Sequence, residues 1–276
     1  MRPRSGVALA FACAALLIVP TAASAARPVP SWLTPSKLQQ PHQQGTLKVG
    51  EERLNAECPG VQGAGVSAAG CIVAPAGCTA NFIFASGATR YVGTARHCVN
   101  AIGEEVAMQV DTTTIAVVGT VSHMTSGEGV PGNDWALIQI DPAVAQKWGV
   151  TPAIPVVGGP QGVYSGCAVG TPVVHYGHGY GVAVAQGKLE GGVSTNWHND
   201  GFGWAGFGAP GDSGSAVLTA GRQAVGDFTH LIVDGGDYLG SDLAGTRITK
   251  AMSQFGVSLV NADGSLTAPG ATTSCG

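Results

Sequence analysis

Short apolar runs separated by glycine-rich turns form the main pattern of this chain from about residue 58 onward. Runs of this length, bounded by turn residues, are typical of β-strands. In the first half we expect strands at Asn81–Ala85, Arg90–Thr94, Val106–Val110, Thr114–Val121 and Trp135–Ile140. In the second half we expect them at Pro172–Tyr176, Gly181–Glu190, Gly203–Gly206, Gly214–Thr219 and Ala224–Val233. One helix is predicted over Ala244–Phe255, where apolar residues recur every three to four positions.

The composition favours the same architecture. Glycine accounts for 43 of the 276 residues, and only 11% of residues are charged, against about 25% in ordinary globular chains. Many short strands with tight turns and few charges predict an all-β protein. Prolines at 152 and 155, followed by Gly158-Gly159-Pro160, mark a crossover. We therefore expect two halves, 58–157 and 158–276.

The N-terminus has the pattern of an export signal. A basic start, Met1-Arg2-Pro3-Arg4, precedes an apolar run from Val7 to Val19 and a small-residue segment ending at Ala26. This order predicts a signal peptide over residues 1–26 and a secreted protein. The run is shorter than the ~20 apolar residues of a spanning helix, so we expect no membrane attachment after cleavage. Residues 27–57 are rich in Pro and Gln and predict an extension or a short propeptide.

Charge excludes one class of partner. The sequence has 13 Lys and Arg residues against 17 Asp and Glu, a formal net charge of −4. Binding to nucleic acid depends on a basic surface, which this balance does not favour. We expect no nucleic-acid partner and no cofactor. We also expect no metal, because the sequence has no Cys-x-x-Cys pair.

The segment Gly211-Asp212-Ser213-Gly214-Ser215 is the strongest candidate for chemistry. Glycines at 211 and 214 leave the Ser213 hydroxyl accessible and allow unusual backbone angles. The N–H groups of Gly211 and Ser213 could then converge on a developing oxyanion beside that hydroxyl. By itself the segment is also compatible with a plain surface turn.

Two upstream motifs supply what a nucleophilic serine needs. A serine requires a nearby base, and the base requires an orienting group. His97 follows a predicted hairpin in Tyr91–Cys98, and Asp134 opens an apolar strand. A buried carboxylate needs a polar partner. An imidazole would satisfy Asp134 and would be held in the tautomer that accepts the serine proton.

Together these motifs resemble the chymotrypsin-like serine proteases, in particular the short secreted forms from actinobacteria. The matching stretches are Thr94-Ala95-Arg96-His97-Cys98, Asp134-Trp135-Ala136-Leu137 and Gly211-Asp212-Ser213-Gly214. The chain order His, Asp, Ser differs from that of subtilisins and α/β-hydrolases. The resemblance implies two six-stranded antiparallel Greek-key barrels with the active site between them, plus a C-terminal helix. It also implies a monomeric endopeptidase that cleaves protein or peptide substrates through an acyl-enzyme.

The resemblance also places the specificity pocket. Its base would be Phe207, six residues before the serine, which argues against a preference for basic side chains. Thr229, His230 and Leu231 would form one wall, where an extended peptide adds as a strand. Thr229 is a candidate partner for Asp134. We rank an apolar or aromatic preference first, and a glutamate preference, favoured by His230, second.

The cysteines fit an exported protein. Cys13 lies in the signal peptide, and six remain, at positions 58, 71, 78, 98, 167 and 275. As in the resembled family, Cys78–Cys98 would close the hairpin that carries His97. The other four permit three pairings, of which we prefer Cys58–Cys71 with Cys167–Cys275.

Three questions stay open at this stage. The chain has no Ile-Val-Gly-Gly-like start, so the partner of Asp212 is not identified. His175 and His178 could be metal ligands, although a structural role is favoured. A secreted binding or adhesion protein on a protease scaffold, or an esterase, would share the same motifs, because a fold does not fix a function.

Overall fold

A computed structural model describes residues 66–67, 70–74, 77–110, 115–127, 129–179, 188–232, 240–270 and 274–275. All of them belong to one compact unit that spans residues 31–276. The expected signal peptide and the extension that follows it lie outside the described residues.

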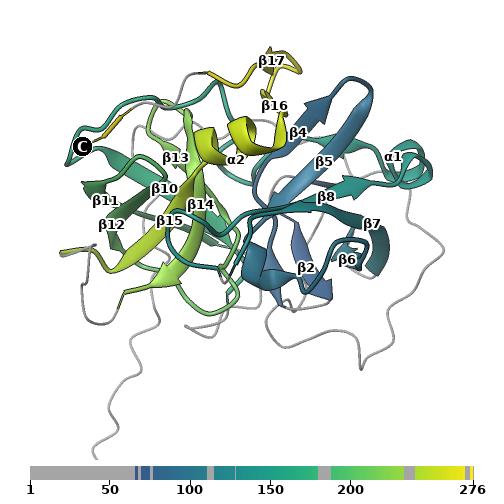
Figure 1. Ribbon diagram of the computed structural model, residues 1–276, viewed down its shortest axis with the longest axis horizontal. Helices are drawn as coiled ribbons and strands as arrows, with labels where there is room; N and C mark the ends of the chain where they lie inside the picture. The colour runs from purple at the N-terminus through teal and green to yellow at the C-terminus, as the bar shows by residue number, and fades with distance from the viewer. Residues whose placement is uncertain are drawn as a thin grey trace, which may run out of the picture. The chain divides into compact units, whose positions relative to one another are not determined.

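The second half of the chain forms a closed, antiparallel six-stranded barrel (Figure 1). Its strands follow the order β10-β11-β12-β15-β14-β13 around the barrel. Their bounds are Pro172–Gly177 (β10), Lys188–Trp197 (β11), Gly201–Gly206 (β12), Ala216–Thr219 (β13), Ala224–Leu231 (β14) and Leu243–Arg247 (β15). Closure gives every strand two hydrogen-bonded neighbours, so the barrel has no open edge.

The first half forms a nine-stranded sheet in the order β17-β16-β4-β5-β8-β7-β6-β2-β3. Its bounds are Cys71–Ala74 (β2), Cys78–Thr79 (β3), Ile83–Ser86 (β4), Thr89–Thr94 (β5), Glu105–Gln109 (β6), Ile115–Met124 (β7), Ala136–Ile140 (β8), Ser258–Val260 (β16) and Leu266–Thr267 (β17). Two further short strands, β1 (Val66–Ser67) and β9 (Val150–Thr151), pair in parallel. The all-β class is confirmed. The last two strands of the chain add to the sheet of the first half, which the sequence did not indicate.

The predicted helix is correct in its second part and wrong in its first. Helix α2 spans Ile248–Phe255, while Leu243–Arg247 is strand β15. β15 pairs with β12 on one side and with β14 on the other, and these two hydrogen-bonded edges decide its conformation. Helix α1, Pro142–Trp148, was not predicted. Asp141 caps it by accepting from the Ala143 N–H at 2.7 Å, and proline occupies its first position.

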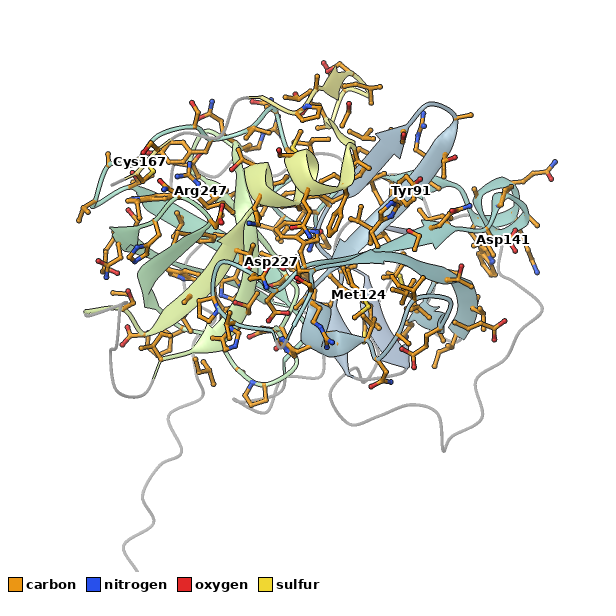
Figure 2. All side chains as sticks on the ribbon, in the orientation of Figure 1. Tyr91, Met124, Asp141, Cys167, Asp227 and Arg247 are labelled. Atoms are coloured by element: carbon orange, nitrogen blue, oxygen red, sulfur yellow. A yellow bond between two sulfur atoms is a disulfide. The ribbon has the colours of Figure 1, made fainter. Side chains whose placement is uncertain are left out.

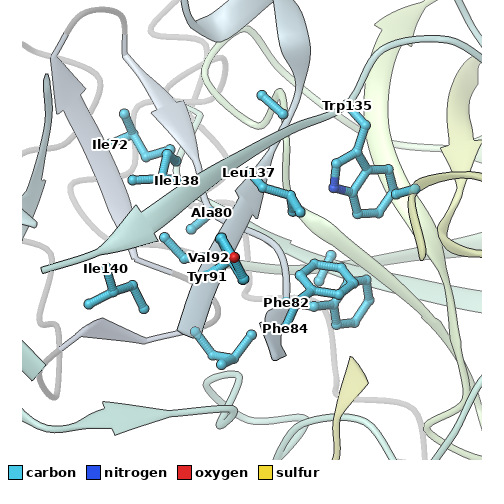
Figure 3. Packing of buried hydrophobic residues seen from close by; sticks show 14 of the residues in the cluster. Ile72, Ala80, Phe82, Phe84, Tyr91, Val92, Trp135, Leu137, Ile138 and Ile140 are labelled. Carbon is cyan, nitrogen blue, oxygen red and sulfur yellow. The ribbon is translucent and has the colours of Figure 1, made fainter. Parts of the chain in front are cut away.

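The main core contains aromatic side chains that lie close to the site. Phe84 and Trp135 are fully buried, and their rings meet edge to face with centroids 6.0 Å apart (Figure 3). The same cluster includes Val174 and Leu218 of the barrel and Met252 of α2. The sheet, the barrel and the helix therefore share one core.

A second core fills the barrel with stacked rings. Trp197, Phe202 and Trp204 stack in sequence at 5.7 and 5.2 Å, so the two tryptophans are core residues and do not line a groove. Arg247 covers Trp197 at 5.3 Å and donates to the Gly166 carbonyl at 3.2 Å. Figure 2 shows Arg247 beside Cys167, whose disulfide to Cys275 ties down the C-terminal tail.

The disulfides agree with the preferred pairings. Cys78 is bonded to Cys98 and Cys167 to Cys275. Cys71 is also in a disulfide, whose partner lies outside the described residues, so Cys58–Cys71 stays a prediction. Within the described chain, no helix combines the length and the apolar character needed to cross a bilayer.

Replacing Phe84 with alanine tests the importance of the main core. Loss of a fully buried phenylalanine should lower the free energy of unfolding by about 3–5 kcal/mol, because a cavity is left beside Trp135. Leu266→Ala is the control. Leu266 is exposed in β17, and its loss should change stability by no more than about 0.5 kcal/mol. Urea unfolding of both variants makes the comparison, and equal losses would contradict the packing described here.

Candidate active site

His97 and Asp134 are joined at two points. The His97 ring nitrogen Nδ1 lies 2.7 Å from Asp134 Oδ2, and the His97 backbone N–H donates to Asp134 Oδ1 at 2.9 Å. Asp134 is fully buried, whereas 37% of the His97 side chain is exposed. The carboxylate therefore sets both the orientation and the tautomer of the ring. With the proton on Nδ1, the other nitrogen, Nε2, is free to accept one.

Local structure explains why the two residues meet. Strand β5 ends at Thr94, and a single 3₁₀ turn, Arg96–Cys98, follows it. β5 pairs with β8, the strand that Asp134 precedes, with Thr94 opposite Ala136. The ends of two neighbouring strands thus bring imidazole and carboxylate together, and the Cys78–Cys98 disulfide anchors the turn. Thr246 also holds the backbone of Asp134, because its hydroxyl accepts from the Asp134 N–H at 3.0 Å.

The Ser213 loop enters from the barrel, between β12 and β13, and packs against the residues around His97. The Thr79 N–H donates to the Ser213 carbonyl at 2.8 Å, and Cys98 Sγ lies 3.8 Å from the same oxygen. Gly214 has a positive φ of 88°, and a Cβ there would come within 2.4 Å of the Thr94 hydroxyl. The loop therefore lies directly against the end of β5.

In the described chain no hydrogen bond joins the Ser213 hydroxyl to His97. Catalytic hydrogen bonds are often long without substrate and tighten in the reacting complex. The structure brings the three predicted residues into one region, with the direct contact formed between His97 and Asp134.

The backbone of the loop leaves two donors unused. The N–H groups of Asp212, Gly214 and Ser215 donate to backbone carbonyls. By contrast, within the described chain the N–H groups of Gly211 and Ser213 donate to no protein acceptor. Gly211 has a φ of 99°, and its carbonyl is turned away to accept from the Thr79 hydroxyl at 2.8 Å. Two unused donors beside a serine are what stabilisation of an oxyanion requires.

The structure identifies partners for Asp212. Its two carboxylate oxygens accept from the N–H of Gly179 at 2.6 Å and of Ala209 at 2.8 Å. Burial raises the pKa of Asp212, and the nearby His175 opposes this effect. Backbone donors therefore hold Asp212 and, with it, the loop that carries Ser213.

His175 is a structural residue of the barrel. It is fully buried, and its Nε2 lies 2.8 Å from the Phe207 carbonyl, so this nitrogen carries the proton. Its Nδ1 lies 3.2 Å from the Ser215 hydroxyl oxygen. Potential metal-ligand atoms of His175, Glu190 and Asp212 lie within 4.8 Å of one another, a spacing compatible with a metal ion. However, both ring nitrogens of His175 and both oxygens of Asp212 already make hydrogen bonds.

His230 lies beside the His97–Asp134 pair. The two histidine rings are 5.9 Å apart, and His230 Nδ1 is 3.9 Å from Asp134 Oδ2. Burial lowers the pKa of His230, and the charge of Asp134 partly offsets this. The expected hydrogen bond from Thr229 to Asp134 is wrong. The Thr229 hydroxyl donates to the Ala244 carbonyl at 3.1 Å, because Thr229 is turned toward β15.

The remaining pocket candidates are exposed. Phe207 is 53% and Leu231 is 46% accessible. Residues 233–239, which follow the expected wall, lie outside the described residues. The roles of these two residues, and that of Thr229, therefore stay predictions.

Thr79, Thr246 and Asp227 were not predicted from the sequence. Thr79 and Thr246 carried no signal, because threonine is common in strands. Asp227 did carry one. It interrupts the apolar run Ala224–Phe228 as a lone carboxylate, which is the same pattern that singled out Asp134.

The comparisons with known proteins found similar solved structures. Thermobifida fusca protease A is 23% identical over 67% of this chain and 91% of its own, with a TM-score of 0.47. Cellulomonas bogoriensis chymotrypsin is 20% identical over 74% of this chain and 98% of its own, with a TM-score of 0.48. A glutamic acid specific serine protease, described as using a histidine triad in substrate binding, is 24% identical over 70% and 98%, also at 0.48.

No protein-family model and no curated protein matches the chain.

Replacing Gly214 with alanine tests the seating of the loop. The new Cβ would lie 2.3 Å from the Thr79 carbonyl, so the loop must move away from His97. We expect the rate of labelling of Ser213 by a fluorophosphonate to fall at least about 100-fold, the loss of a well-positioned group. Gly240→Ala is the matched control. It has a similar φ of 80° with nothing within 4 Å, so it carries the strain of about 1–2 kcal/mol without the clash. Equal labelling rates of the two variants would contradict the described position of the Ser213 loop.

Proposed function

We propose that this protein is a secreted serine endopeptidase with His97, Asp134 and Ser213 as its catalytic residues. The observation that carries the proposal is the two-point bond between His97 and the buried Asp134, next to a serine loop with two unused N–H donors. A structural histidine–aspartate pair would not need such donors beside it. The signal-like segment 1–26 and the disulfides support export.

Each group has a distinct role in the proposed reaction. His97 Nε2 takes the proton of the Ser213 hydroxyl as the serine oxygen attacks the peptide carbonyl. The N–H groups of Gly211 and Ser213 stabilise the negative oxygen of the tetrahedral intermediate. His97 then gives the proton to the leaving amine, and water releases the acyl group by the same steps. No cofactor or metal takes part in this scheme.

Substrate preference follows from the proposed pocket. Phe207 at its base has no charge to pair with Lys or Arg, so apolar or aromatic side chains are favoured. A glutamate preference is the alternative, and one of the similar solved structures is a glutamic acid specific protease. In this chain, however, His230 Nδ1 lies 2.8 Å from the Thr229 hydroxyl and 3.9 Å from Asp134 Oδ2. His230 therefore offers less support for that alternative than the sequence suggested.

Two rival functions use the same scaffold. A binding or adhesion protein would have no reason to keep the Gly211 and Ser213 N–H groups unpaired. An esterase would use the same groups, and comparing matched peptide and ester substrates separates it from a peptidase.

Replacing Ser213 with alanine is the direct test of the proposal. Hydrolysis of casein should fall by at least about 10⁴-fold, while the unfolding midpoint stays close to that of the wild type. Ser253→Ala, at an exposed position of α2, is the control and should keep full activity. Wild-type turnover by the Ser213 variant would refute the triad.

Cleavage of a peptide library tests the pocket. We expect cuts after Phe, Tyr, Leu or Met, and few after Lys or Arg, because a buried cation without a partner is costly. Mass spectrometry of the products identifies the residue before each cut. A dominant signal after Glu would select the alternative, and one after Lys or Arg would contradict both.

A further inference from the structure

A second carboxyl group, that of Asp227, lies behind the proposed active site. Asp227 is on β14 and is fully buried. Figure 2 shows it in the interior, below helix α2 in the view. One oxygen, Oδ1, accepts from the Thr246 N–H at 3.1 Å. The other, Oδ2, has no hydrogen-bond partner within the described chain.

Thr246 connects this group to Asp134. Its backbone N–H donates to Asp227, and its hydroxyl accepts from the backbone N–H of Asp134 at 3.0 Å. One residue of β15 therefore holds both acidic residues. A movement of Asp227 that displaces Thr246 would also displace Asp134, and with it the ring of His97.

The two carboxyl groups have opposite surroundings. Asp134 accepts two hydrogen bonds from His97 and has His230 Nδ1 at 3.9 Å. Asp227 accepts from the Thr246 N–H through Oδ1 only, and within the described chain it forms no ion pair. A buried carboxylate with an unsatisfied oxygen is costly, whereas the neutral acid is not. Burial raises the pKa of Asp227 well above its usual value, and the negative charge of Asp134 raises it further.

Among the described residues, the elements packed around Asp227 supply no compensating cation. β13, Ala216–Thr219, has no titratable residue. On β15, Arg247 is turned toward Gly166 and Trp197. On α2, Lys250 pairs with Asp200 at 2.8 Å. His97 and His230 lie next to Asp134, and the charge that acts on Asp227 is that of Asp134.

We infer that Asp227 is a positioning residue that keeps its proton at neutral pH, so that Asp134 alone carries the negative charge beside His97. Loss of this proton in alkaline solution would place two like charges on either side of Thr246 and loosen its hold on Asp134. The catalytic part of this inference rests on the proposed function, whereas the protonation of Asp227 does not.

The sign of the effect on stability follows from linkage. The unfolded chain releases this proton near the ordinary aspartate pKa of about 3.9, while the folded protein keeps it. The folded state therefore binds more protons over the interval between the two pKa values, and the free energy of unfolding falls as pH rises through it. Above the pKa of the folded state the effect levels off.

Asp227→Asn tests the inference, because asparagine has the same shape and no proton to lose. The unfolding midpoint of wild type and variant is measured from about pH 5 to about pH 9. We expect the midpoint of the variant, relative to wild type, to rise steadily with pH. The rate of fluorophosphonate labelling should also stay high up to a higher pH in the variant than in the wild type. Asp200→Asn, which removes a half-exposed acid on the surface, should give a difference that does not vary with pH.

A constant difference between wild type and Asp227→Asn would overturn the inference. The midpoints can be measured in a Ser213→Ala background, so this result does not depend on catalysis. The protonation test would therefore remain valid if the protein proved not to be a peptidase. Likewise, a negative protonation test would leave the proposed function unaffected.

Infrared spectroscopy covers the case in which Asp227→Asn does not fold. With ¹³C-labelled aspartate, a protonated carboxyl band should be present in the wild type at neutral pH. It should remain in Asp212→Asn, because Asp212 is the other buried aspartate with a raised pKa. Absence of a protonated aspartate band in the wild type at neutral pH would overturn the inference.

Discussion

The proposed site depends on a buried negative charge held by an imidazole. Asp134 has no contact with solvent, and a carboxylate in that position is stable only if donors surround it. His97 supplies two of them, one from its ring and one from its backbone. The same bonds that make the carboxylate tolerable in the core fix the ring of His97. Stability and the orientation of the proposed base are therefore two results of one interaction.

The rest of the fold brings a serine to this pair from a different sheet of the same compact unit. His97 follows β5 and Asp134 precedes β8 of the nine-stranded sheet, whereas Ser213 belongs to a loop of the closed barrel. Contacts with Thr79, Thr94 and Cys98 seat the loop against the end of β5. Asp212, held by backbone donors, fixes the other side of the loop. Rigid elements, rather than the loop alone, thus set the geometry.

Asp134 and Asp227 are both buried, but their surroundings favour different protonation states. Asp134 is satisfied by donors, and Asp227 is not. Where two titratable groups interact, the environment that favours charge on one disfavours it on the other. Thr246 links them, so a residue without catalytic chemistry of its own connects the charge state of the interior to the position of His97.

The sequence by itself determined the local features: the all-β class, most of the strands, the candidate residues His97, Asp134 and Ser213, and the Cys78–Cys98 pair. These follow from short-range patterns or from motifs that were recognisable without coordinates. Only the tertiary structure decided that Leu243–Arg247 is a strand, that Thr229 turns away from Asp134, and that His230, Thr246 and Asp227 surround the pair. The reason is that each of these depends on a neighbour far away in the chain. β15 is a strand because β12 and β14 offer it two edges. The pKa of Asp227 depends on its burial and on Asp134, which is far from it in the sequence.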